Sequence, residues 1–97
     1  MRYGRRMRQG HLRVGTHPVT VRVVGGVRLV LKSCGYLPYL NVIIEESGEP
    51  AYLRLHGWSF GWGLEAVRGN KPWDGLRFRM YRESDLPRAW YVVEPVD

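Results

Sequence analysis

The sequence predicts an all-β fold: a small antiparallel barrel or sandwich, SH3-like or OB-like, with a flexible basic N-terminal arm. From residue 17 onward, segments rich in β-branched residues follow one another, and several alternate apolar with polar positions. Turn signals containing Gly and Pro separate these segments at short spacing. No long apolar pattern with the helical period of 3.6 residues occurs. In a chain of 97 residues we expect an arm over residues 1–16 and a single β domain over residues 17–97.

The arm is predicted from its composition. Residues 1–16 hold five Arg and three Gly, and few large apolar side chains. Such a segment buries too little apolar surface to order itself, so we expect it to be mobile until it binds a partner.

Residues 17–33 are predicted to form a first hairpin that turns at Gly25-Gly26. A three-residue loop starting at Val24 places six aliphatic side chains on one face, namely Val19, Val21, Val23, Val27, Leu29 and Leu31. Arg22 and Arg28 then lie opposite each other on the second face. Because like charges directly opposite are unfavourable, we expect an anion or a carboxylate between them.

A second hairpin is predicted over residues 39–58, with residues 46–49 as its loop. Pairing Ile44 with Ala51 collects the aliphatic side chains of both strands on one face. The other face then carries the cross-strand pairs Tyr39/His56, Asn41/Arg54 and Ile43/Tyr52.

Two further strands are predicted toward the C-terminus, after a loop at residues 68–75. Residues 76–83 alternate cleanly, with Leu76, Phe78 and Met80 inward and Arg77, Arg79 and Tyr81 outward. A last strand over residues 89–96 is ended by Pro95, and we expect it at an edge of the sheet.

Charge is distributed unevenly along the chain. Residues 1–44 carry seven Arg and one Lys and no acid, whereas residues 45–97 carry seven bases and nine acids, for a net charge of +6. A one-sided basic segment that prefers Arg over Lys indicates a polyanion partner, because guanidinium groups pair bidentately with phosphate. The alternative is a compositional bias toward Arg from a GC-rich genome.

The stretch HGWSFGWG, residues 56–63, places Trp58, Phe60 and Trp62 at every second position. On a strand these rings share one face, where they either stack on nucleobases or fill the core. Burial preferences favour the core for at least two of them, with one ring exposed.

Several classes of function are disfavoured. The lone Cys34 allows no internal disulfide and fits a reducing cytosol, and no signal peptide or membrane-spanning segment is predicted. His11, His17 and His56 show no metal-ligand spacing. We therefore expect a cytoplasmic, non-enzymatic protein without a metal or cofactor.

The resulting hypothesis is a non-catalytic domain that binds DNA or RNA largely independently of sequence. Its predicted contacts are Arg2, Arg5, Arg6, Arg8 and Arg13 as a flexible phosphate clamp, Arg22, Arg28, Arg77 and Arg79 along a groove, and Tyr81 with Trp58 or Trp62 as stacking surfaces. The alternative is a protein-interaction or self-assembly module, in which exposed edge strands and aromatic residues bind a protein or form a homo-oligomer.

Overall fold

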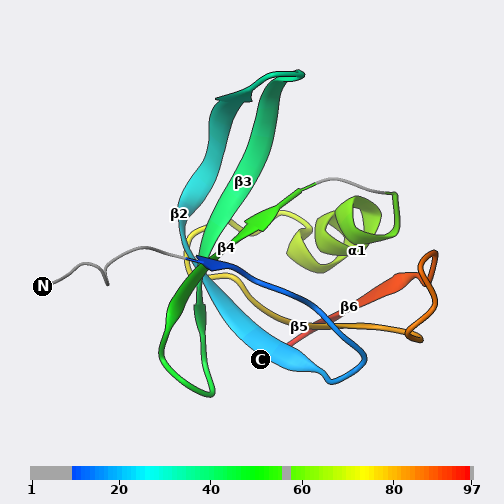
Figure 1. Ribbon diagram of the computed structural model, residues 1–97. Coiled ribbons are helices and arrows are strands. Elements are labelled where there is room, and N and C mark those ends of the chain that lie inside the picture. Colours follow the sequence, from blue (N-terminus) through cyan, green and yellow to red (C-terminus); the bar gives the residue numbers. More distant parts are fainter. Residues whose placement is uncertain (1–9, 56–57, 97) are drawn as a thin grey trace, which may run out of the picture.

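One mixed β-sheet curls into a half-barrel and is accompanied by one short helix (Figure 1). The structure is a computed structural model that describes residues 10–55 and 58–96, with the backbone alone described for residues 58–62. In chain order, the elements of these ranges are β1 (Gly10–His11), β2 (Val19–Lys32), β3 (Gly35–Ile44), β4 (Pro50–Arg54), α1 (Trp58–Arg68), β5 (Arg77–Arg82) and β6 (Tyr91–Pro95). The strand order is β1-β4-β3-β2-β5-β6. The predicted β fold is thus confirmed as a small, mostly-β domain. The all-β and purely antiparallel parts of the prediction are wrong, because α1 is a helix and β1 pairs with β4 in parallel.

Strand β2 is the long central strand of the sheet. It pairs with β3 from Val21 to Lys32, but with β5 only from Val19 to Arg22. The predicted turn at Gly25-Gly26 is therefore wrong, because β2 continues through it with an irregular register between Val24 and Arg28.

Gly25 accommodates this bulge with a positive φ of 80°, so the glycine signal marks a bulge within a strand rather than its end. The chain reverses instead at Ser33-Cys34, where Gly35 has a φ of 116°. As a result, the far part of the β2–β3 hairpin projects away from the rest of the molecule (Figure 1).

The core lies on the inner face of the curled sheet. Its largest fully buried side chains are Phe78, Leu40, Leu64, Met80, Val21, Val23 and Val42. Leu76, Phe78 and Met80 face inward as predicted, and β6 ends the sheet as the predicted edge strand. Of the six aliphatic residues expected to share a buried face, Val21 and Val23 are buried, whereas Val27, Leu29 and Leu31 are exposed.

The β3–β4 hairpin differs from its prediction by two residues of register. Leu40 pairs with Leu53 and Asn41 with Tyr52, because the loop spans residues 45–49. A slip of two residues returns every side chain to the face predicted for it, since strand side chains alternate with period two.

Trp58, Phe60 and Trp62 belong to α1, so the strand predicted for them is wrong. The helix is held by its second half: Leu64 is buried in the core, and Val67 packs against that core. A Cβ at Gly63 would lie 3.0 Å from Val93 Cγ2, so this glycine lets α1 approach β6 closely.

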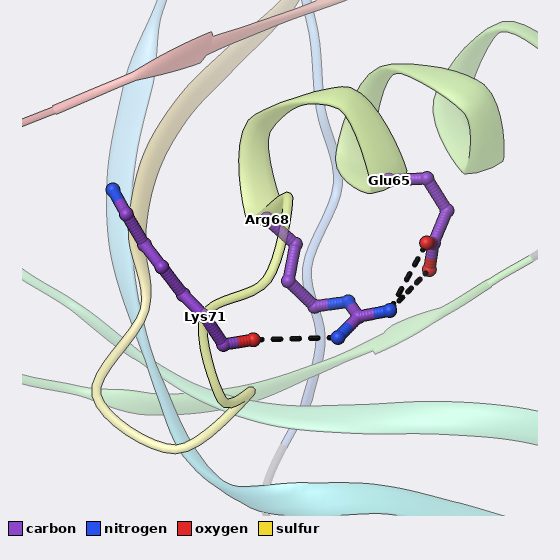
Figure 2. A network of polar contacts seen from close by, with 3 residues as sticks. All are labelled: Glu65, Arg68 and Lys71. Atoms are coloured by element: carbon purple, nitrogen blue, oxygen red, sulfur yellow. Dashed lines mark hydrogen bonds and ion pairs between the residues drawn. The ribbon is translucent and has the colours of Figure 1, made fainter.

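The C-terminal end of α1 is fixed to the loop that follows it. Figure 2 shows the guanidinium of Arg68 between the Glu65 carboxylate, at 3.1 Å, and the Lys71 carbonyl, at 3.3 Å. The same guanidinium lies 4.7 Å from the ring centroid of Trp73. Gly69, with a φ of 57°, ends the helix in the left-handed conformation common at this position.

Residues 10–15, part of the segment predicted to be a mobile arm, connect β4 with β5 through backbone hydrogen bonds. Leu12 N donates to Tyr52 O on β4 at 2.9 Å, and Arg82 N on β5 donates to Gly15 O at 2.7 Å. Leu12 and Val14 pack against the core. Residues 1–9 of the predicted arm lie outside the described part of the chain. Within the described part, no helix is long and apolar enough to cross a membrane.

The bulge of β2 is tied to the loop before β5 by Asp74, whose Oδ1 accepts from Gly25 N at 2.7 Å. Replacing Asp74 by Ala leaves this amide without its acceptor and is expected to lower the free energy of unfolding by about 1 kcal/mol in urea titrations. The exposed Asp85, for which no hydrogen bond occurs in the described structure, provides the matched control in D85A. Equal losses in the two variants would contradict this role for Asp74.

Candidate functional site

The outer face of the sheet, opposite the core, gathers basic and aromatic side chains. Arg28 on β2, Tyr39 on β3 and Arg54 on β4 form one cross-strand row, so the three side chains point to the same side. Lys32 Nζ lies 5.7 Å from the ring centroid of Tyr39. We call the set on β1 to β4 the basic face; its members are Arg28, Lys32, Arg54, Tyr39, Asn41, Tyr52 and His11.

Aromatic rings extend this face across three strands. The ring centroids of Tyr39 and Tyr52 are 5.4 Å apart with a tilt of 52°, and those of Tyr52 and His11 are 5.2 Å apart at 74°. Tyr39 is only 6% exposed, so it supports the surrounding side chains from beneath. Tyr52 is half-buried and His11 is exposed, so these two rings are more accessible than that of Tyr39.

The cations of the basic face have no acidic partner among the described residues. Arg28 Nη2 donates to the neutral amide oxygen of Asn41 at 3.0 Å. The Nε of Arg54 is buried and has no hydrogen-bond partner within the described ranges. The Nε atoms of Arg68 and Arg82 are in the same condition, so this feature does not distinguish Arg54 from arginines outside the basic face.

A second group of arginines lies on the outer face of β2 and β5, and here acids neutralise the charge. Arg22 lies opposite Arg77. Glu45 accepts two hydrogen bonds from Arg77, at 2.5 Å from Nε and 2.7 Å from Nη2. The predicted pairing of Arg22 with Arg28 is wrong, because both belong to β2 and Arg28 lies opposite Tyr39. Glu45 instead lies beside Arg77, the cross-strand neighbour of Arg22.

Arg79 and Tyr81 also lie on the outer face of β5, as predicted from the alternation. Arg79 Nε forms an ion pair with Glu94 on β6 at 2.9 Å, with both side chains partly exposed. Tyr81 is half-buried. The structure therefore brings Arg22, Arg77 and Arg79 together, but two of the three are already paired with carboxylates.

The other predicted contact residues lie apart from these groups or outside the description. Arg13 is exposed in the segment that follows β1. Trp58 and Trp62 belong to the first turns of α1, and their side chains are not described. The clamp residues Arg2, Arg5, Arg6 and Arg8 lie outside the described residues, as does His56, whose predicted place opposite Tyr39 is taken by Arg54.

Most of the basic face is absent from the contacts predicted from sequence. Lys32, Tyr39, Asn41, Tyr52, Arg54 and His11 are the additions. Part of the basic face can be identified from the sequence, because the alternation of residues 39–54 assigns Tyr39, Asn41, Tyr52 and Arg54 to one face. Arg28 and Lys32 of β2 add two cations to this face, and His11 of β1 adds a ring. Their position beside it follows only from the strand order.

A pocket of about 360 Å³ opens beside residues 11–14, which line it together with Leu53, Arg54, Met80 and Tyr91. Apolar and cationic side chains around one pocket can accommodate a sugar or base while its phosphate meets a guanidinium.

Within the described ranges, no three His, Cys, Asp or Glu side chains gather closely enough to hold a metal ion. Comparisons of the chain with protein-family models, with curated proteins and with solved structures yield no match.

The ion pair with Arg77 makes Glu45 sensitive to acid. The hydrogen bond from Arg77 holds the pKa of Glu45 below its ordinary value of 4.5, with desolvation opposing and the charges of Arg77 and Arg22 adding to the decrease. A lowered folded-state pKa stabilises the fold above pH 4.5, and this contribution is lost as the pH falls through the folded-state value.

The E45Q variant is therefore expected to lose less stability than the wild type between pH 7 and pH 3 in urea titrations. E46Q, which alters an exposed neighbouring acid, should keep the wild-type pH dependence. An unchanged pH dependence in E45Q would show that the Arg77–Glu45 pair does not contribute to acid stability.

Proposed function

We propose that the protein is a non-catalytic nucleic-acid-binding domain, largely independent of sequence, that uses contacts from Arg and Lys to phosphates together with aromatic stacking. The single observation that carries this proposal is the basic face. It places Arg28, Lys32 and Arg54 around aromatic rings, without an acidic partner among the described residues. Cations tracking a phosphate backbone beside flat rings are the features shared by surfaces that bind single strands.

The same proposal includes an OB-like assignment of the fold. In its favour, strands β2 to β6 follow the order β4-β3-β2-β5-β6 in a curled, partly open sheet. OB-folds are partly open five-stranded barrels that bind oligonucleotides on the face of their second and third strands. The corresponding strands here are β3 and β4, which carry Tyr39, Asn41, Tyr52 and Arg54.

In this proposal each side chain has a distinct part. Arg28, Lys32 and Arg54 contact successive phosphates, and Tyr52 with His11 stacks on bases. Arg22, Arg77 and Arg79 continue the path onto β5, with Tyr81 beside them. Arg13 and the arm residues Arg2, Arg5, Arg6 and Arg8 clamp the backbone, and Trp58 or Trp62 adds a further stacking surface.

This mode of binding sets the expected response to salt and sequence. Neutralising about six phosphates gives a slope near −5 for log affinity against log salt on duplex DNA, and about −4 on single strands. Contacts to phosphate position a protein without reading bases, so affinity should change little between sequences of equal length.

The test compares two double variants with equal loss of charge. R28A/K32A removes two cations of the basic face, whereas K71A/R88A removes two exposed cations that lie outside it. In fluorescence anisotropy with labelled single- and double-stranded DNA and RNA, R28A/K32A should bind about tenfold more weakly and flatten the salt slope by about 1.5. Equal effects of the two variants would assign binding to net charge alone, and no binding by the wild type at low salt would reject the proposal.

A further inference from the structure

We propose that the projecting part of the β2–β3 hairpin is a dimerisation surface, occupied by the same surface of a second copy of the chain. We call residues 27–38 the β-arm. The bulge at Gly25 separates the β-arm from the part of β2 that pairs with β5, and Figure 1 shows it standing clear of the other elements. The inference concerns assembly and is independent of the proposed nucleic-acid function.

The first argument is the unusual exposure of apolar side chains on the β-arm. Leu29 is 67% exposed, Leu31 is 66% exposed and Tyr36 is 67% exposed. Leu31 pairs directly with Tyr36, and Leu29 pairs with Pro38, so all four side chains lie on one face. An apolar face of this kind on a small soluble domain marks an interaction surface.

The second argument is that this face continues the protein's own core face. Pro38 lies two residues before Leu40, which is fully buried, so the side chains of both point to the inner side of the sheet. The core side of the sheet thus extends along the β-arm beyond the elements that cover it. A second sheet packed face to face is the usual way in which such a surface is buried.

The third argument is the placement of charge, which argues against a polyanion as the occupant and is compatible with a second copy of the chain. Arg28 and Lys32 pair with Tyr39 and Gly35, so they belong to the opposite face, and the apolar face carries no charged side chain. A polyanion finds no cation there. Two copies that pack through this face bring no like charges together, and the Leu29, Leu31 and Tyr36 side chains of each meet those of the other in a symmetric interface.

Such a dimer would leave both basic faces directed outward, because Arg28 and Lys32 lie on the far side of each β-arm. If the proposed function holds, two linked faces would bind a long strand more tightly than a short one, through effective concentration rather than new contacts. This consequence rests on the proposed function, whereas the dimer does not.

The test is the molar mass of the full chain, measured by sedimentation equilibrium from low micromolar to submillimolar protein without nucleic acid. Leu31→Lys places a charge in the proposed interface, and Leu86→Lys is the matched control, since Leu86 is 69% exposed and lies outside the β-arm. Both sites are exposed, so both variants should fold, as far-ultraviolet circular dichroism will verify. We expect a concentration-dependent dimer for the wild type and L86K, and at least a tenfold weaker dimer for L31K.

A wild type that stays monomeric throughout this range would overturn the proposal, as would equal weakening by L31K and L86K. Cys34, the only cysteine in the sequence, lies exposed at the tip of the β-arm and gives a second readout. Energy transfer between donor and acceptor labels on Cys34, which does not require the two labels to touch, should rise with protein concentration in L86K and not in L31K. Binding of a short oligonucleotide should be equal in both variants, so failure of the dimer is distinguishable from failure of the nucleic-acid proposal.

Discussion

The rest of the fold depends on how the backbone of β2 is shared between two neighbours. Up to Val23, β2 is bonded on both sides: Val23 N donates to Leu76 O at 2.8 Å, and Gly75 N donates to Val23 O at 2.9 Å. The pairing with β5 itself ends at Arg22, and Val23 bonds to the loop before β5. The next amide on this side, that of Gly25, donates to the Asp74 side chain instead of to a backbone carbonyl. The part of β2 that is bonded on both sides lies in the curled sheet over Phe78 and its neighbours. The part that is bonded only to β3 projects from the rest of the molecule as the β-arm.

The curl of the sheet also separates the charges. The acid-free first half of the chain supplies β2 and β3, and together with β4 and β1 these strands present the basic face. The acids that pair with β5 lie in the loop after β3 and on β6. Glu45 forms an ion pair with Arg77, and Glu94 forms one with Arg79. The arginines of β5 and those of the basic face therefore differ in net local charge. Carboxylates neutralise Arg77 and Arg79, whereas Arg28 and Arg54 have no acidic partner among the described residues.

The elements that sequence reasoning predicts well are those whose side chains alternate over a half-buried strand. The alternation of residues 76–81 correctly places Phe78 and Met80 inside and Arg77 and Arg79 outside, and the faces of β3 and β4 survive a register error of two residues. Errors arise where one local sequence pattern is compatible with two different local conformations. A Gly-Gly pair fits a bulge as well as a turn, and Trp58, Phe60 and Trp62 alternate as on a strand although tertiary packing of Leu64 and Val67 holds a helix there. The basic face combines residues from four strands, so it depends on strand order, which local patterns do not encode.

Titration of the ¹⁵N-labelled protein with a short single-stranded oligonucleotide, followed by amide chemical shifts at low salt, identifies the surface that binds the strand. We expect the largest shifts on Tyr39, Asn41, Tyr52 and Arg54, with smaller shifts on β5, and we expect them to disappear as salt is raised. Shifts confined to β5 and β6, or to residues 1–16 alone, would contradict the assignment of the basic face as the binding surface. A spectrum that stays unchanged at low salt would contradict nucleic-acid binding altogether.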